Sequence, residues 1–159
     1  MFSVEHSVPV NADLAPGEPR LTRHHVWLGL VLKAEDAVPF VPAMSWCQVT
    51  GRFDNGLFRD IVFHGEAMTE KILFHPEEKV EFIRTAGIEM GTIVNEILED
   101  AAGGLSLRFA FTLEREGLAH GSAEERDFAD GMASGYLIAV QATVDEIRQR
   151  VKDGVIAAG

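Results

Sequence analysis

The sequence predicts an α+β fold in which a curved, seven-stranded antiparallel sheet wraps around a long C-terminal helix. Six short segments of alternating apolar and polar residues lie between residues 45 and 114, with turn residues between them. An apolar stripe with helical spacing follows residue 122, and a further alternating segment opens the chain. Because a sheet of this size curls around whatever covers its concave face, the long helix is the expected cover.

The N-terminal region is predicted to hold one strand and a helical segment. Alternation from Phe2 indicates a strand of about eight residues, which ends before the breaker Pro16. Thr22 can cap a short helix that closes near Asp36, and a turn region with two prolines follows at 38–42. The helical segment therefore separates the first strand from the other six.

The middle of the chain is predicted to form an antiparallel meander. Asn55-Gly56 is the strongest turn signal, because both central residues of a type I′ hairpin need positive φ and this dipeptide tolerates it. The six predicted strands span approximately 45–53, 57–64, 68–75, 79–85, 92–99 and 105–114.

The last segment is predicted to form one helix that crosses the whole sheet. Ser122 and Glu125 have the spacing of a capping box, and a stop signal follows at Asp153-Gly154. About thirty residues at a rise of 1.5 Å give a length of roughly 45 Å. Small residues in its stripe, such as Gly135 and Ala139, leave room for a cavity between helix and sheet, where a small apolar ligand could bind.

This order of elements resembles the helix-grip fold of the START and birch-pollen-allergen-like superfamily, also called SRPBCC, which includes polyketide cyclases, aromatases and lipid carriers. Four segments look like the AtaL-like branch: Leu21-Thr22-Arg23, residues 27–36, Phe40-Val41-Pro42-Ala43 and Asn95-Glu96-Ile97. The resemblance implies a single helix-grip domain over residues 1–159, with short helices after the first strand. The branch carries no established reaction, so it assigns no catalytic residue.

Strand alternation places four polar residues on the inner face of the sheet. They are Arg59, Glu70, Arg84 and Asn95, on four successive predicted strands, and we expect them to meet near mid-strand. Two arginines and one carboxylate would leave surplus positive charge for an anionic or carbonyl-bearing ligand. Two alternatives remain open: a buried salt bridge that only stabilises the fold, and partial solvation at the rim of the sheet.

Apolar residues are expected to line the rest of the pocket. They come from the inner face of the sheet and from the stripe of the long helix. The hydroxyl group of Tyr136 could donate to a ligand carbonyl, to Glu70 or to Asn95. The predicted lining residues are Phe82, Phe109, Met132 and Tyr136.

Composition argues against several classes of function. Fourteen Lys and Arg against twenty-five Asp and Glu give a net charge of −11, which argues against nucleic acid or an anionic membrane as a partner. The first residues lack a basic region followed by an apolar run, and no stretch is long enough to span a bilayer, so we expect neither targeting nor membrane insertion. The single cysteine, Cys47, fits a reducing compartment, so the expected location is cytoplasmic.

Metal, cofactor and thiol chemistry also lack a sequence signal. The adjacent His24 and His25 would point about 100° apart on a helix and cannot chelate together, so we expect no metal site. A glycine-rich phosphate loop before a helix is missing, and no cofactor is expected. Cys47 has no identifiable neighbouring base and is interpreted as a small apolar packing residue.

The leading hypothesis is a protein that encloses a small hydrophobic or aromatic molecule. The alternative is a polyketide cyclase or aromatase-like enzyme, in which Glu70 is the general acid or base and an arginine stabilises an oxyanion. Burial would raise the pKa of this carboxyl group and the two arginines would lower it, so the sequence leaves the direction of the net pKa shift open. A third alternative is an interaction module with a solid core. The expected partners are therefore the small molecule and, as an open alternative, a second copy in a homodimer.

Overall fold

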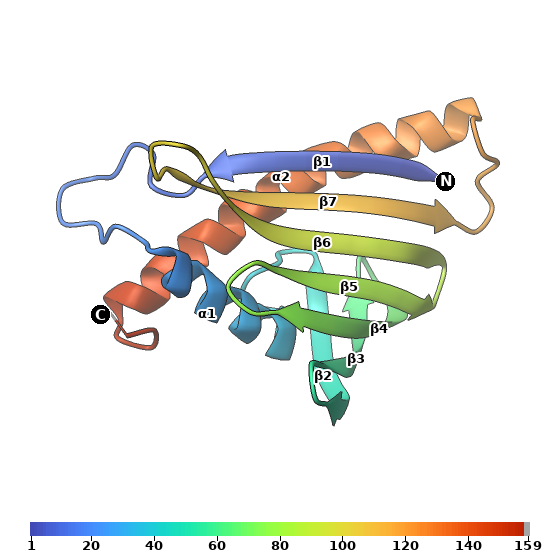
Figure 1. The fold of residues 1–159 in the computed structure, drawn as a ribbon. Helices are drawn as coiled ribbons and strands as arrows, with labels where there is room; N and C mark the ends of the chain where they lie inside the picture. The colour runs from blue at the N-terminus through green and yellow to red at the C-terminus, as the bar shows by residue number, and fades with distance from the viewer. Residues whose placement is uncertain (158–159) are drawn as a thin grey trace.

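The computed structural model describes residues 1–157 as a seven-stranded antiparallel sheet with helices α1 and α2 against it (Figure 1). The strand order β1-β7-β6-β5-β4-β3-β2 places β1 and β2 at opposite edges. This architecture confirms the predicted fold class. The elements are β1 Phe2–Pro9, α1 Arg23–Glu35, β2 Met44–Phe53, β3 Gly56–Phe63, β4 Glu66–His75, β5 Lys79–Ala86, β6 Glu89–Glu99, β7 Leu105–Arg115 and α2 Ala123–Lys152.

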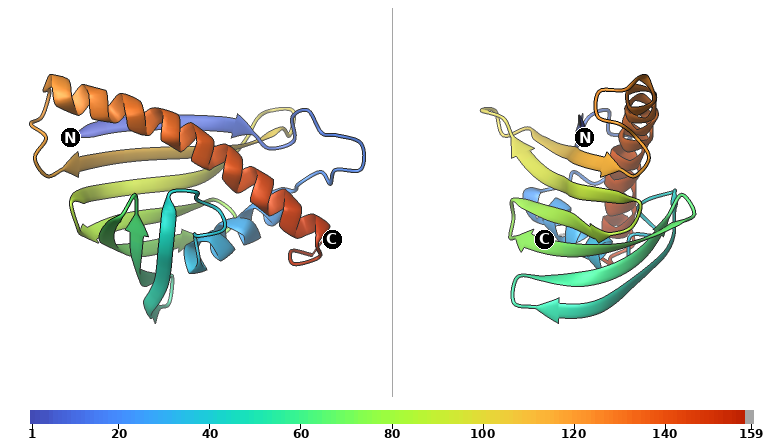
Figure 2. Two further views of the ribbon diagram at one scale, coloured as in Figure 1. Left: turned by 180° about the vertical axis from the view of Figure 1, so that it is seen from behind. Right: turned by 90° about the vertical axis from the view of Figure 1, so that its right-hand side faces the viewer.

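The sheet curves strongly, and α2 runs diagonally across its concave side (Figure 2). The six strands of the meander agree with their predicted ranges to within three residues. The largest difference is in β6, which begins at Glu89 rather than at residue 92. That shift brings an additional acidic residue into the sheet, with consequences for the buried site.

The segment between β1 and β2 contains one helix rather than two. The hydroxyl oxygen of Thr22 accepts a hydrogen bond from the His25 backbone N–H at 3.1 Å, which confirms the predicted cap of α1. After α1 the chain forms turns, in which the N–H groups of Phe40 and Val41 both donate to the Ala37 carbonyl at 2.9 Å. Residues 38–42 include two prolines, which lack a backbone N–H, so a second helix does not form there.

A tight turn joins β2 to β3 at residues 54–55, close to the predicted position, but it is not the type I′ turn expected for Asn55-Gly56. Gly56 pairs with Phe53 inside the sheet, and neither Asn55 nor Gly56 has positive φ. The dipeptide with positive φ at both residues is His64-Gly65, at 49° and 77°, between β3 and β4. Gly56 is required for a different reason: a Cβ atom there would lie 1.8 Å from the Ile72 carbonyl oxygen.

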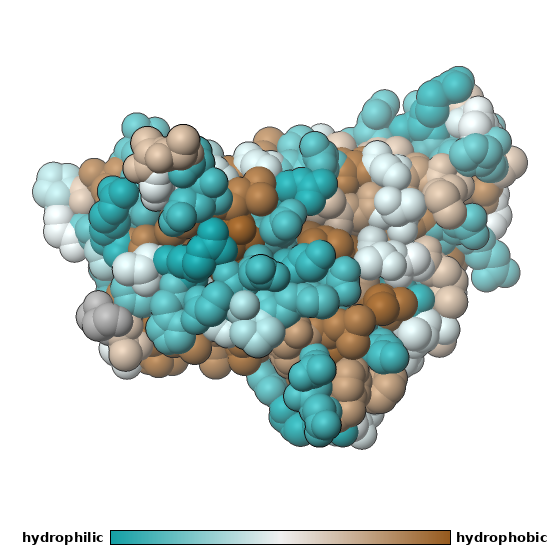
Figure 3. Space-filling model, in the orientation of Figure 1, coloured by the Kyte–Doolittle hydropathy of each residue, from teal (hydrophilic) through white to brown (hydrophobic). Residues whose placement is uncertain are grey.

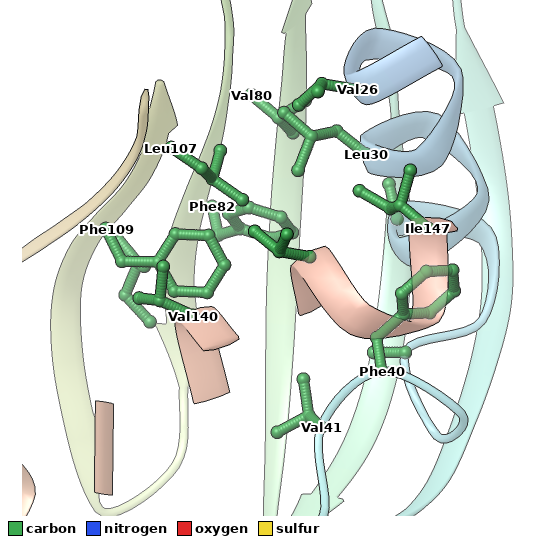
Figure 4. Packing of buried hydrophobic residues seen from close by; sticks show 14 of the residues in the cluster. Val26, Leu30, Phe40, Val41, Val80, Phe82, Leu107, Phe109, Val140 and Ile147 are labelled. Carbon is green, nitrogen blue, oxygen red and sulfur yellow. The ribbon is translucent and has the colours of Figure 1, made fainter. Parts of the chain in front are cut away.

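The main core lies between the inner face of the sheet and the two helices. On β7, Leu107, Phe109, Phe111 and Leu113 are buried, as the alternation predicts. Hydrophilic residues gather across the middle of the outer face (Figure 3). Figure 4 shows the packing of ten labelled core side chains: Val26, Leu30, Phe40, Val41, Val80, Phe82, Leu107, Phe109, Val140 and Ile147.

Helix α2 begins and ends close to where the sequence predicts. Ser122 Oγ accepts a hydrogen bond from the Glu125 backbone N–H at 3.1 Å. In a capping box the Glu125 carboxylate would accept from the Ser122 backbone N–H. It accepts instead from the backbone N–H of Gly121, one residue earlier, at 3.0 Å. Neither helix within residues 1–157 combines the length and apolarity that crossing a membrane would require.

The Gly56 contact gives a stability prediction. Gly56→Ala should lower the free energy of unfolding by roughly 2–4 kcal/mol, because the added methyl group forces the β3 and β4 backbones apart. The control is Gly65→Ala, where a Cβ atom has open space and only the positive φ opposes it, at about 1 kcal/mol. Urea unfolding of both variants checks this, and equal losses would contradict the steric explanation.

Candidate functional site

A cavity of about 600 Å³ lies between the first half of α2 and the inner face of the sheet. Its volume falls within the range of small-molecule sites. Helix α2 leaves space here because it presents Gly131, Gly135 and Ala139 to the cavity. Most of the wall is apolar and includes Phe63, Phe82, Ile93, Phe109, Phe128, Met132 and Ile138.

A chain of buried ion pairs crosses the sheet beside this cavity. Arg59 Nε donates to Glu70 Oε1 at 2.9 Å, and Arg84 Nε donates to Glu70 Oε2 at 3.3 Å. Arg84 Nη1 also donates to Glu89 Oε1 at 2.5 Å. None of these four side chains exposes more than 3% of its surface. Buried charges are tolerated here because each guanidinium group contacts a carboxylate.

The chain of charges continues from Glu89 toward the surface. Arg115 donates from Nη1 to Glu89 at 3.1 Å and from Nη2 to Glu66 at 2.6 Å. Three arginines thus alternate with three glutamates, and their formal charges cancel. The surplus positive charge predicted for this network is therefore wrong.

Glu89 is the residue that the sequence analysis missed in this network. The predicted strands 79–85 and 92–99 leave residues 86–91 as a turn, whereas β6 already begins at Glu89. Glu89 shares the parity of Ile93 and Asn95, so extending that strand by three residues would have placed its carboxylate on the inner face.

Glu70 remains ionised within the network. Burial by itself raises the pKa of its carboxyl group, but the charges of Arg59 and Arg84 outweigh burial and hold the pKa below its ordinary value. Both carboxylate oxygens bind guanidinium groups, and Glu70 does not contribute to the cavity wall. The geometry therefore gives Glu70 a structural role and leaves no proton on it for general acid chemistry.

Asn95 does not join the ion pairs, contrary to expectation. Arg84 on β5 pairs with Gly91 on β6, whereas Asn95 on β6 pairs with Val80 on β5. Arg84 and Val80 are four residues apart, about 13 Å along the strand. Asn95 Oδ1 instead accepts a hydrogen bond from Lys33 Nζ at 2.8 Å, and no group within residues 1–157 accepts a hydrogen bond from the buried Asn95 Nδ2.

Lys33 is the second site residue that the sequence analysis missed. Lys33 lies in the last turn of α1, but its side chain is buried and forms part of the cavity wall. Lys33 Nζ lies 4.5 Å from the ring centroid of Phe82 and 5.0 Å from that of Phe109. The spacing of Val26, Leu30 and Lys33, at positions i, i+4 and i+7, would have placed it on the apolar face.

Arg59 connects the ion pairs to α1. Its Nη1 atom donates to the carbonyl oxygens of Lys33 at 2.9 Å and Ala34 at 3.0 Å. These carbonyls belong to the last turn of α1, where a cation is favoured by the helix dipole. The guanidinium group thereby fixes the backbone from which the Lys33 side chain enters the cavity.

The environment of Lys33 favours its neutral amine. Burial, followed by the positive charge of Arg59, lowers the pKa of Lys33 from 10.5 to about 7. Arg84 acts in the same direction, whereas Glu70 and Cys47 oppose it. At neutral pH the lysine is therefore present in both protonation states.

The predicted site residues divide into two groups. Arg59 and Glu70 lie behind the wall. Tyr136 packs on Phe111, with ring centroids 4.2 Å apart, and burial raises its pKa, so its hydroxyl group stays protonated. Within residues 1–157 this hydroxyl makes no hydrogen bond to Glu70 or Asn95. The predicted residues in the cavity wall are Phe82, Arg84, Asn95, Phe109, Met132 and Tyr136.

The histidines and the cysteine are dispersed. His64 lies at the cavity rim, His24 pairs with Glu77 at the surface, and Cys47 is half-buried against the core. In the described part of the chain, no three His, Cys, Asp or Glu side chains come together as a metal site would require.

The ion pairs give a second stability prediction. Glu70→Gln should lower the free energy of unfolding by about 3–5 kcal/mol, because two buried guanidinium groups lose the charge that compensates them. Glu35→Gln makes the same change in a surface pair with Arg52 and should have a far smaller effect. Similar losses in the two variants, measured by thermal and urea unfolding, would show that the buried network does not hold the sheet.

Lys33 gives a pH prediction. The folded chain releases the Lys33 proton near pH 7 and the unfolded chain near 10.5, so between these values the unfolded state binds more protons and stability rises with pH. As pH increases, the free energy of unfolding of the wild type should therefore rise relative to that of Lys33→Met, by up to roughly 1.4 kcal/mol per pH unit. Urea unfolding from about pH 6 to about pH 9 measures this difference; parallel curves would contradict it.

Structural comparison shows that this fold recurs in proteins of low sequence identity. TTHA0849 from Thermus thermophilus is similar with a TM-score of 0.71 and 13% identity, over 96% of this chain and 99% of that chain. Zhui aromatase/cyclase from Streptomyces sp. R1128 has a TM-score of 0.65 and 16% identity, over 99% and 98%. Ara h 8.0201 has a TM-score of 0.58 and 13% identity, over 96% and 98%.

Sequence comparison identifies the family of the chain. No curated protein matches the chain. The model of the family described as AtaL, acetylaranotin biosynthesis cluster protein L, matches residues 4–154. This match spans nearly all of the elements described above, from β1 to the end of α2. The chain therefore belongs to the AtaL family.

Proposed function

We propose that this protein binds a small hydrophobic or aromatic molecule that carries a hydrogen-bond-accepting group. The observation that carries the proposal is the pairing, in one apolar cavity, of two buried donors, Asn95 Nδ2 and Lys33 Nζ. The aromatic and aliphatic wall would contact the body of the ligand. The donors would bind its polar end.

The unpartnered amide supports the presence of an acceptor on the ligand. A buried donor without a partner costs free energy comparable to a lost hydrogen bond, and nearly all such groups in folded proteins are paired. An oxygen or nitrogen acceptor on a ligand in the cavity would supply the hydrogen bond that Asn95 Nδ2 lacks within residues 1–157. Of the neighbouring charges, the arginines are already matched by glutamates, which leaves Lys33 as the cation for a carbonyl or a single anionic group.

The alternative function is a polyketide cyclase or aromatase-like enzyme. The fold shared with the Zhui aromatase/cyclase is compatible with this alternative. The geometry gives less support to Glu70 as its general acid or base, because that carboxylate lies behind the wall and is bound by two arginines. Ligand binding is therefore the function that the site supports best.

We propose a cytoplasmic location and a small-molecule partner on the basis of composition. A single cysteine fits a reducing compartment. A net charge of −11 favours a small ligand over nucleic acid as the partner.

Filling the cavity tests the proposal. Ala139→Trp places an indole in the cavity wall and should abolish uptake of the aromatic, anionic dye 1-anilinonaphthalene-8-sulfonate, which the wild type should bind with enhanced fluorescence. Ser134→Trp is the matched control, because Ser134 is an exposed residue of the same helix outside the cavity wall, and uptake should be unchanged. Thermal unfolding verifies that both variants fold. Equal dye binding by the two folded variants would contradict the proposed site.

A further inference from the structure

We propose that Lys33 is a nucleophile whose Nζ amine forms an imine with the carbonyl group of an aldehyde or ketone bound in the cavity. This inference rests on the proposed ligand-binding function. It goes beyond that function by naming the chemical class of the ligand and the covalent bond that forms. Its support comes from the location of the amine, its hydrogen bond and its charge environment.

The amine is enclosed but faces the cavity. Lys33 is only 5% exposed, and its side chain forms part of the cavity wall. Its Nζ atom lies over the rings of Phe82 and Phe109, which would also contact an aromatic ligand. Among residues 1–157, no carboxylate lies within 4.0 Å of this amine, so no ion pair holds the proton on it.

Asn95 places a hydrogen-bond donor beside the nucleophile. Its Oδ1 atom accepts from Lys33 Nζ at 2.8 Å, and its buried Nδ2 atom has no hydrogen-bond partner in the described part of the chain. Because both atoms belong to one amide group, the free N–H lies close to the amine. A carbonyl group whose carbon approaches Nζ can direct its oxygen to Nδ2, where negative charge develops during attack.

The charge environment supports a reactive amine at neutral pH. Only the neutral form of a lysine has the lone pair that attacks a carbonyl carbon. Burial and the charge of Arg59 lower the pKa of Lys33 to about 7, so about half of the molecules carry the neutral form at that pH. A solvent-exposed lysine, with a pKa near 10.4, is almost fully protonated under the same conditions.

The reaction is balanced without an oxidant or reductant. The Nζ lone pair forms the new C–N bond, and the carbonyl π electrons move to oxygen. Proton transfer from nitrogen to oxygen gives the neutral carbinolamine. Loss of its hydroxyl group with the remaining N–H proton releases one water molecule and leaves the C=N bond of the imine.

Reductive trapping tests the inference. The wild-type protein is incubated with 2-naphthaldehyde and sodium cyanoborohydride at about pH 7, which converts an imine into a stable secondary amine. Peptide mapping by mass spectrometry then compares Lys33 with the three other lysines, Lys71, Lys79 and Lys152. The expected result is at least about tenfold more adduct on Lys33, because a far larger share of it is neutral. Equal labelling of all four lysines would overturn the inference.

Two controls separate this inference from the proposed function. Uptake of 2-naphthol, which has no carbonyl group, is followed by its fluorescence in parallel. If the naphthol binds and Lys33 carries no adduct, imine formation is refuted and ligand binding stands; if neither occurs, both proposals fall. In Ala139→Trp, the filled cavity should remove the Lys33 adduct and leave labelling of the other lysines unchanged. Persistence of the Lys33 adduct in that variant would refute the cavity as the place of reaction.

Discussion

The contact between the Arg59 guanidinium group and the last turn of α1 is the constraint on which the site geometry depends. Arg59 reaches from the sheet to the Lys33 and Ala34 carbonyls, and its other nitrogens bind Glu70. The same side chain thus holds the last turn of α1 in place. It is also the first charge in the alternating row of arginines and glutamates across the sheet. Because a buried guanidinium group needs acceptors on several sides, its position determines those of the helix and of the strand that carries Glu70.

Most of the fold was predictable because its elements have clear periods. The alternation of Leu107, Phe109 and Phe111 and the helical stripe after Ser122 predict element type and inward face without knowledge of the tertiary structure. The type of the β2–β3 turn was not predictable in the same way. Asn55-Gly56 has a favourable turn composition, but Gly56 pairs with Phe53 inside the sheet and lies against the Ile72 carbonyl, and neither residue has positive φ.

The candidate site was predictable in part. Parity places Arg59, Glu70 and Arg84 on the inner face, and their registers bring them together. Lys33 and Glu89 were missed because each stands near the end of an element, where charged residues are usually solvated and boundaries are least certain. The separation of Asn95 from Arg84 depends on the pairing of β5 with β6, which a single sequence does not specify.

The small residues of α2 separate the shape of the cavity from the stability of the fold. At Gly131 and Gly135 an added Cβ atom meets no neighbouring atom within 4 Å, although both residues contribute to the cavity wall. Larger side chains at these positions would reshape the space available to a ligand while leaving the contacts of the sheet intact. Point changes on one helix face can therefore alter the shape of the cavity while the charge network and the strand register are preserved.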